Sequence, residues 1–372
     1  MQDKKAKTQW QGKSKGSVWG YKVFVLLIKR LGVRWAYGLL VFVAFYYFLF
    51  ERRSNRVLRY YFRQRLGYSW AKTWVSLYRN YFVFGQTIID KVAVSAQLRD
   101  RFTYDFDGVE HLQALLRAHK GGVLISAHIG NFEMAEPFFR EIDEDCQIHT
   151  VTVDLERTAI RDYLQEISSA PPPKYIYIKD DLSHIFEINE ALQHHGIICL
   201  TGDRYFEGNK YLSAPLLGQM ARFPAGPFHI ASRLGVPVIF VYVMKERNLH
   251  YHLYARVAQT AHRDAQGLLS AFTQSMEQML QRYPLQWFNY FDFWEELETK
   301  SKKWKACSAP HERDELQALI IVRHELKLLN TWKQVCDSRQ PMGFTFYLLL
   351  FTFTKVVYLY KADKGIRNNN RP

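Results

Sequence analysis

The sequence predicts an α/β fold in which a mixed β-sheet is covered by helices, with a membrane helix near the N-terminus. Short apolar runs of strand length alternate with amphipathic helical stretches through the middle of the chain. Hydrophobic residues make up 48% of the 372 residues, so a sizeable core can be buried. An uncharged aromatic and aliphatic run, residues 35–50, lies close to the N-terminus.

The first sixty residues concentrate basic charge around that apolar run. They carry thirteen Lys or Arg and two acidic residues, a balance of +11 out of +14 for the chain. A nucleic-acid-binding domain usually carries its basic patch on the folded body, so this distribution favours anionic lipid headgroups instead. As a helix the run is about 24 Å long, slightly short of a bilayer core.

We therefore expect membrane attachment, with a full span favoured over an interfacial helix and a buried core helix as the alternative. Arg34 on one side and Arg52–Arg53 on the other can reach the headgroups. A secretory signal peptide is not expected, because charged residues follow the run in place of a cleavage site.

The body of the chain is predicted element by element. The amphipathic stretch 55–98, rich in aromatic residues, is predicted to be helical. We predict strands over residues 102–106, 122–126, 147–153, 175–178, 197–201, 237–244 and 250–257. We predict helices over residues 109–118, 159–167, 182–194, 227–234 and 270–283.

Three parts are expected: a basic N-terminus with the membrane helix (1–54), an α/β domain (55–297) and a C-terminal extension (298–372). The extension contains a predicted amphipathic helix, 312–335, and an apolar run, 343–353, that is too short to span a bilayer. The four cysteines form no C-x-x-C pair, and their spacing suits neither a zinc site nor a disulfide framework. No cluster of ligand residues predicts a metal.

The motif H-I-G-N-F-E, residues 128–133, follows the buried strand-like run V-L-I-S-A. Ligands bind at the carboxyl ends of strands in α/β sheets, and a histidine there can act as a general base. A carboxylate bonded to the far ring nitrogen would fix the tautomer, which predicts that Glu133 holds the imidazole of His128. A structural histidine at a strand end is the alternative.

Two further motifs predict anion contacts. G-D-R-Y-F-E-G, residues 202–208, follows another apolar strand and should lie at the same sheet edge, where Asp203 and Arg204 would orient a polar headgroup or pair with a phosphate. A-R-F-P-A-G-P, residues 221–227, precedes a helix, and Arg222 would meet an anionic group. An ordinary turn and the start of a helix are the alternatives.

The last motif, Q-W-F-N-Y-F-D-F-W over residues 286–294, is either core or a lipid-facing lip. Together the four motifs resemble the lysophospholipid acyltransferase superfamily over about residues 15–297. The resemblance is greatest to the bacterial lipid A late acyltransferases and, within that branch, to predicted acyltransferases of aryl polyene and flexirubin gene clusters. Typical lipid A enzymes lack the sequence seen here at residues 202–208 and the closing aromatic cluster. The resemblance therefore does not identify the acceptor lipid.

The resemblance implies an O-acyltransferase of a bacterial inner membrane, with its catalytic domain on the cytoplasmic face. It implies His128 as the base and Glu133 as its acidic partner, and we expect Asn131, Asp203, Arg204 and Arg222 to contact substrate. It implies a thioester of acyl carrier protein or coenzyme A as donor, a glycolipid, lipid A-like or aryl polyene-type lipid as acceptor, and no cofactor. The alternatives are a lipid esterase that uses Ser126 and a non-enzymatic membrane scaffold.

Overall fold

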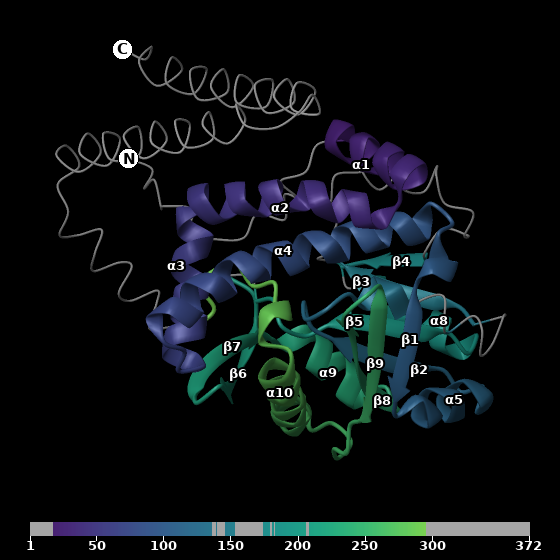
Figure 1. Cartoon of the computed structure of the whole chain (residues 1–372). Helices are drawn as coiled ribbons and strands as arrows, with labels where there is room; N and C mark the ends of the chain where they lie inside the picture. The colour runs from purple at the N-terminus through teal and green to yellow at the C-terminus, as the bar shows by residue number, and fades with distance from the viewer. Residues whose placement is uncertain are drawn as a thin grey trace, which may run out of the picture. The chain divides into compact units, whose positions relative to one another are not determined.

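The computed structural model describes residues 18–135, 139, 146–152, 174–178, 181, 183–205 and 208–294 (Figure 1). The chain divides into two compact units, Met1–Lys300 and Ser301–Pro372. The predicted helices 159–167 and 312–335 and the apolar run 343–353 lie outside the described residues.

A seven-stranded mixed sheet forms the centre of the first unit, as predicted. The strands follow the order β1-β9-β8-β2-β5-β3-β4, and neighbouring strands are parallel except for the antiparallel pair β8 and β9. Their bounds are Thr103–Asp107 (β1), Gly122–Ser126 (β2), Ile148–Thr152 (β3), Lys174–Tyr177 (β4), Ile197–Thr201 (β5), Val238–Lys245 (β8) and His250–Val257 (β9).

Helices cover both faces of this sheet. They are α1 (Val18–Leu31), α2 (Val33–Phe50), α3 (Arg52–Tyr60), α4 (Trp70–Ser95), α5 (Val109–Arg117), α8 (Ser183–Gln193), α9 (Ala225–Arg233) and α10 (Ala265–Arg282). A π-helical turn (Tyr61–Arg65) and the 3-10 turns η2 (Arg99–Arg101), η3 (Phe132–Ala135) and η4 (Pro284–Gln286) complete the described helical elements. Helix α10 begins earlier than predicted because the Asp264 carboxylate caps it by accepting a hydrogen bond from the Gly267 amide at 2.7 Å.

Strand β2 is buried on both faces, which explains its uninterrupted apolar sequence. Val123 and Ile125 point into the core shared with α9 and α10, whereas Leu124 points into the core shared with α1, α4 and α5. A strand covered on both faces can be approached by a substrate only at its ends, and ligands of α/β sheets bind at the carboxyl end. His128 follows that end.

The hairpin of β6 (Tyr211–Leu216) and β7 (Gln219–Pro224) was not predicted. Its turn, Leu217–Gly218, has positive φ at both residues. This geometry suits a tight hairpin, but the leucine at the first position hid the turn signal. The predicted helix over residues 227–234 is α9, which begins directly after the hairpin at Ala225.

Helix α2 lies against α4 rather than apart from the domain (Figure 1). Its buried residues, Val33, Ala36, Leu40 and Ala44, follow a spacing of three or four and form one stripe. Gly85 of α4 admits Leu40, because a Cβ there would stand 2.2 Å from its Cδ1 atom. By length and composition α2 is the one described helix that could cross a membrane.

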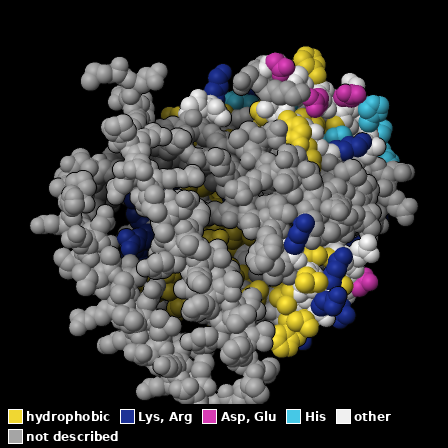
Figure 2. All heavy atoms as spheres, turned by 90° about the horizontal axis from the view of Figure 1, so that it is seen from above, with side chains coloured by type: hydrophobic (Ala, Val, Ile, Leu, Met, Phe, Trp, Pro, Cys, Tyr) yellow, Lys and Arg dark blue, Asp and Glu magenta, His cyan; other side chains and the backbone are white. Residues whose placement is uncertain are grey.

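The opposite stripe of α2 is apolar and exposed. Its large exposed side chains are Trp35, Val41, Phe42, Phe45 and Leu49. Seen from above, hydrophobic and Lys or Arg side chains lie side by side on the coloured part of the molecule (Figure 2). One face of α2 therefore belongs to the core, and the other presents exposed apolar side chains, with the exposed Arg34 and Arg52–Arg53 near its two ends.

Candidate active site

The register of two parallel strands brings His128 and Asp203 together. Ser126, the last residue of β2, pairs with Thr201, the last residue of β5. His128 and Asp203 each follow two residues later, so both side chains leave the same sheet edge at the same level. The Gly202 amide donates to the Ser126 carbonyl at 2.9 Å and extends the pairing beyond the strands.

The two side chains form a closely bonded pair. His128 Nδ1 lies 2.7 Å from Asp203 Oδ1, and the backbone amide of His128 donates to Asp203 Oδ2 at 3.0 Å. The indole nitrogen of Trp287 donates to the same Oδ2 at 3.5 Å. Because the carboxylate engages Nδ1–H, the basic nitrogen of the ring is Nε2. The Asp203 side chain is 2% exposed and that of His128 is 30% exposed, so the ring is the accessible member.

The electrostatics of the pair favour a neutral imidazole. Burial lowers the pKa of His128 below its ordinary value, Asp203 acts against this, and the charge of Arg204 lowers the pKa further. Burial would raise the pKa of Asp203, but its interactions with His128 and the nearby Arg204 lower it. The result is an ionised carboxylate beside a neutral ring, which is a proton acceptor near neutral pH.

Two glycines permit this arrangement. Gly130 adopts a left-handed φ of 69°, and a Cβ there would stand 2.1 Å from the Val243 carbonyl oxygen. A Cβ on Gly202 would stand 3.1 Å from the rings of Phe228 and Phe272. A side chain at position 130 would displace the loop that carries His128, and one at position 202 would require the two phenylalanine rings to shift.

The structure gives Glu133 a different partner from the predicted one. The short turn η3 follows Gly130 and turns the Glu133 side chain outward, where it is 56% exposed and forms an ion pair with Lys91 of α4. Asp203, predicted to contact substrate, takes the place at the imidazole expected for Glu133. The charge of Glu133 still raises the pKa of His128 from a distance, and its predicted role in catalysis stays a prediction.

Asn131 faces the interior rather than an open site. Its side-chain amide donates to the Thr87 carbonyl of α4 at 3.0 Å, and its backbone amide donates to the Val243 carbonyl at 2.7 Å. These bonds join η3 to α4 and β8. Its predicted contact with substrate stays a prediction.

The two predicted arginines lie along a chain of aromatic contacts that begins beside the pair. Arg204 adjoins Asp203, and burial lowers its pKa to about 10. The neighbouring Tyr205 ring lies 5.5 Å from the Tyr211 ring, and the Arg222 guanidinium lies 4.8 Å from the centre of that same Tyr211 ring. Arg204 therefore lies next to Asp203, whereas Arg222, on β7, is linked to this region through the Tyr205 and Tyr211 rings.

The closing aromatic motif forms core rather than a lipid-facing lip. Trp287, Phe288, Phe293 and Trp294 are all buried. Sequence reasoning missed that the Trp287 indole contacts Asp203 and that Asp203 contacts His128. The sequence did contain one signal for the second contact: His128 and Asp203 each lie two residues after the end of a predicted strand.

The geometry of the described residues gives less support to a serine esterase mechanism or to a metal site. Ser126 is 2% exposed, and its hydroxyl donates to the adjacent Ala127 carbonyl at 3.4 Å, so it is poorly placed as an esterase nucleophile. Among the described residues, no three His, Cys, Asp or Glu side chains group as metal ligands would.

A helix-covered mixed sheet with a His–Asp pair at the carboxyl edge of its central strands defines an α/β protein with a candidate general base. The family model described as bacterial lipid A biosynthesis acyltransferase matches residues 4–294, and the chain belongs to that family. No curated protein matches the chain. The predicted resemblance to the lipid A acyltransferase branch is confirmed, whereas the closer resemblance to aryl polyene-cluster enzymes stays a prediction.

Proposed function

We propose that the protein is an O-acyltransferase that moves a fatty acyl group from an acyl carrier protein or coenzyme A thioester to a lipid hydroxyl. The acceptor is a glycolipid, a lipid A-like lipid or an aryl polyene-type lipid. The observation that carries the proposal is the His128–Asp203 pair at the carboxyl edge of β2 and β5, in a chain of an acyltransferase family.

In the proposed reaction, His128 Nε2 takes the proton of the acceptor hydroxyl while the hydroxyl oxygen attacks the thioester carbonyl carbon. The tetrahedral intermediate then collapses, the carbon–sulfur bond breaks, and the imidazolium returns the proton to the departing thiolate. Asp203 holds the ring and stabilises the imidazolium through Nδ1–H. No serine or cysteine nucleophile is needed, because the acceptor hydroxyl is itself the nucleophile.

The remaining predicted residues have supporting roles in this proposal. Arg204 and Arg222 contact anionic parts of the substrates, for which a guanidinium is well shaped. The negative charge of Glu133 favours the imidazolium that forms during attack. Each of these roles is electrostatic and supports the attack on the thioester that His128 assists.

We place the protein on the cytoplasmic face of a bacterial inner membrane. The exposed apolar stripe of α2 and the neighbouring basic residues support contact with an anionic membrane. Because the other stripe packs on α4, we favour an α2 that lies in the membrane interface over one that spans the bilayer alone.

Removing the base tests the function. Purified His128→Ala, assayed for thiol release from an acyl thioester with extracted bacterial lipids as acceptor, should lose at least about 100-fold in rate. His111→Ala, which changes an exposed histidine on α5, should keep wild-type activity. Both variants should keep the wild-type circular dichroism spectrum.

Near-normal turnover of His128→Ala would remove this residue from the mechanism. Labelling of Ser126 by a fluorophosphonate probe would instead support the esterase alternative.

A further inference from the structure

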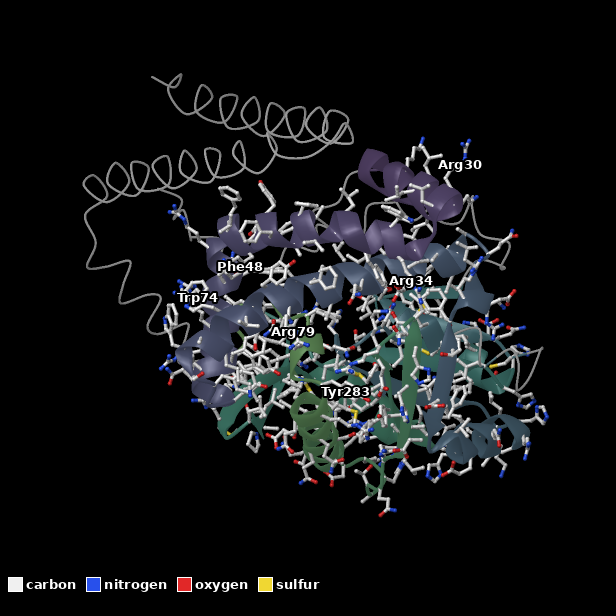
Figure 3. All side chains as sticks on the ribbon, viewed as in Figure 1. Arg30, Arg34, Phe48, Trp74, Arg79 and Tyr283 are labelled. Atoms are coloured by element: carbon white, nitrogen blue, oxygen red, sulfur yellow. The ribbon has the colours of Figure 1, made fainter. Side chains whose placement is uncertain are left out.

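A cavity of about 940 Å³ is lined by four arginines from separate elements. These are Arg34 of α2, Arg79 of α4, Arg247 of the β8–β9 turn and Arg282 of α10, and we call their cavity the arginine pocket. Figure 3 labels Arg34, Arg79 and Tyr283, which lie between helices α2 and α4 above and α10 below. Four cations from distant parts of the sequence thus converge on one space.

Their charge is not balanced within the pocket. None of the four arginines forms an ion pair with a carboxylate among the residues that the structure describes. The one acidic lining residue, Glu246, accepts a hydrogen bond from the Tyr283 hydroxyl at 2.5 Å. Lys245, also in the lining, is compensated by Asp90 at 2.6 Å. The unneutralised guanidinium groups favour an anion, and a phosphate suits their forked donors.

The pocket also has an apolar wall. Phe82 and Val83 line it from α4, Leu249 lines it from the β8–β9 turn and Leu285 from η4. Trp35, next to Arg34 in sequence, is 66% exposed on the apolar face of α2. Cations beside apolar surface match an amphiphile with an anionic head better than a fully polar phosphate compound.

One segment, residues 284–288, connects the arginine pocket with the proposed catalytic pair. Residues of η4, Pro284–Gln286, line the pocket. The next residues reach the other site, because the Trp287 indole contacts Asp203 and the Phe288 amide donates to the His128 carbonyl at 3.0 Å. The same short segment therefore lines the pocket and contacts both members of the pair.

We propose that the arginine pocket binds the phosphate headgroup of an anionic lipid, which rests on the proposed function because that lipid is the acceptor. Binding there anchors the charged end of the acceptor while its hydroxyl reaches His128. The contact exists before and during the reaction, so it sets the affinity for the lipid rather than the rate of the chemical step.

Calorimetry with short-chain lipids tests this site in the full-length protein in non-ionic detergent. Dihexanoyl phosphatidic acid is the probe, and dihexanoyl phosphatidylcholine, inorganic phosphate and coenzyme A are compared with it. The double variant Arg79→Gln/Arg247→Gln should bind phosphatidic acid at least about tenfold more weakly than wild type. The matched control, Arg117→Gln/Arg233→Gln, removes two exposed arginines of α5 and α9 and should bind like wild type.

Two results together support the proposal: wild type binds phosphatidic acid more tightly than the other three probes, and only the pocket variant loses this binding. Binding of coenzyme A or inorganic phosphate as tight as that of phosphatidic acid overturns the lipid assignment, as does equal loss in the control variant. His128→Ala should retain phosphatidic acid binding. Binding without acyl transfer in wild type would therefore sink only the proposed function, and transfer without binding would sink only the pocket.

Discussion

Two buried carboxylates lie near the carboxyl edge of the sheet, each bonded to a basic side chain, and they differ in how accessible that basic side chain is. His128 and Asp203 follow β2 and β5, whereas Lys245 ends β8 and pairs with Asp90 of α4. The His128 side chain is 30% exposed, but that of Lys245 is 4% exposed. Asp90 also accepts hydrogen bonds from the hydroxyl groups of Tyr251, at 2.6 Å, and Tyr37.

The two pairs differ in whether a nitrogen of the basic side chain remains accessible to a substrate. The Lys245 ammonium is shared between Asp90 and the Tyr37 hydroxyl, and burial lowers its pKa while Asp90 acts against this change. Its role is to join α2, α4 and the sheet. Asp203, by contrast, engages only the Nδ1 side of the His128 ring and leaves Nε2 for a substrate. A buried charge pair alone therefore does not mark a catalytic site.

The largest expected effect that separates the pairs is on catalysis. Asp203→Asn should lower kcat by about 1,000-fold or more while the protein stays folded, because an amide cannot stabilise the imidazolium and favours the wrong tautomer. Steady-state thiol release measures this loss, with Asp105→Asn as an exposed control. A loss below tenfold would show that Asp203 is not the positioning residue for His128.

The pH profile separates positioning from mere structural support. The neutral ring is the active form, so activity is present above the pKa of His128 and falls as the pH drops through it. Because burial lowers that pKa, the acid limb in wild type should lie below the ordinary histidine value of about 6.5. Asp203→Asn removes the charge that raises the pKa, so the limb should move further toward acid. An unmoved limb would contradict the assignment.

The Lys245–Asp90 pair should instead govern stability. Asp90→Ala leaves a buried ammonium without its carboxylate and should lower the free energy of unfolding by about 3–5 kcal/mol. The double variant Asp90→Ala/Lys245→Met removes both charges and should recover much of that loss. Denaturant unfolding in detergent measures both changes. Unaltered stability of the single variant would show that water or another group compensates Lys245.

The sequence predicted the sheet well because strands buried on both faces read as uninterrupted apolar runs, as in residues 122–126 and 197–201. It also placed the His128 and Asp203 motifs at one sheet edge. The pairing of their side chains depends on strand register, which local sequence does not reveal, and the spacing within residues 128–133 favours the nearby Glu133 instead. The arginine pocket was missed because its residues come from four elements far apart in the chain.

The smallest expected effect concerns Glu133, the second acidic residue near the base. Its carboxylate is 56% exposed and paired with Lys91, so its influence on His128 is screened by solvent. Glu133→Gln should lower kcat by less than about tenfold, and Glu133→Asp should retain more activity because it keeps the charge. Lys91→Gln serves as the control: it breaks the same ion pair but leaves the carboxylate, so it should not lower kcat. If Glu133→Gln were instead as inactive as Asp203→Asn, the carboxylate would have to leave Lys91 and act directly on the imidazole or the substrate during turnover. In that event His128 would have two acidic partners. The His128–Asp203 and Lys245–Asp90 pairs would then differ only in the exposure of their basic side chains.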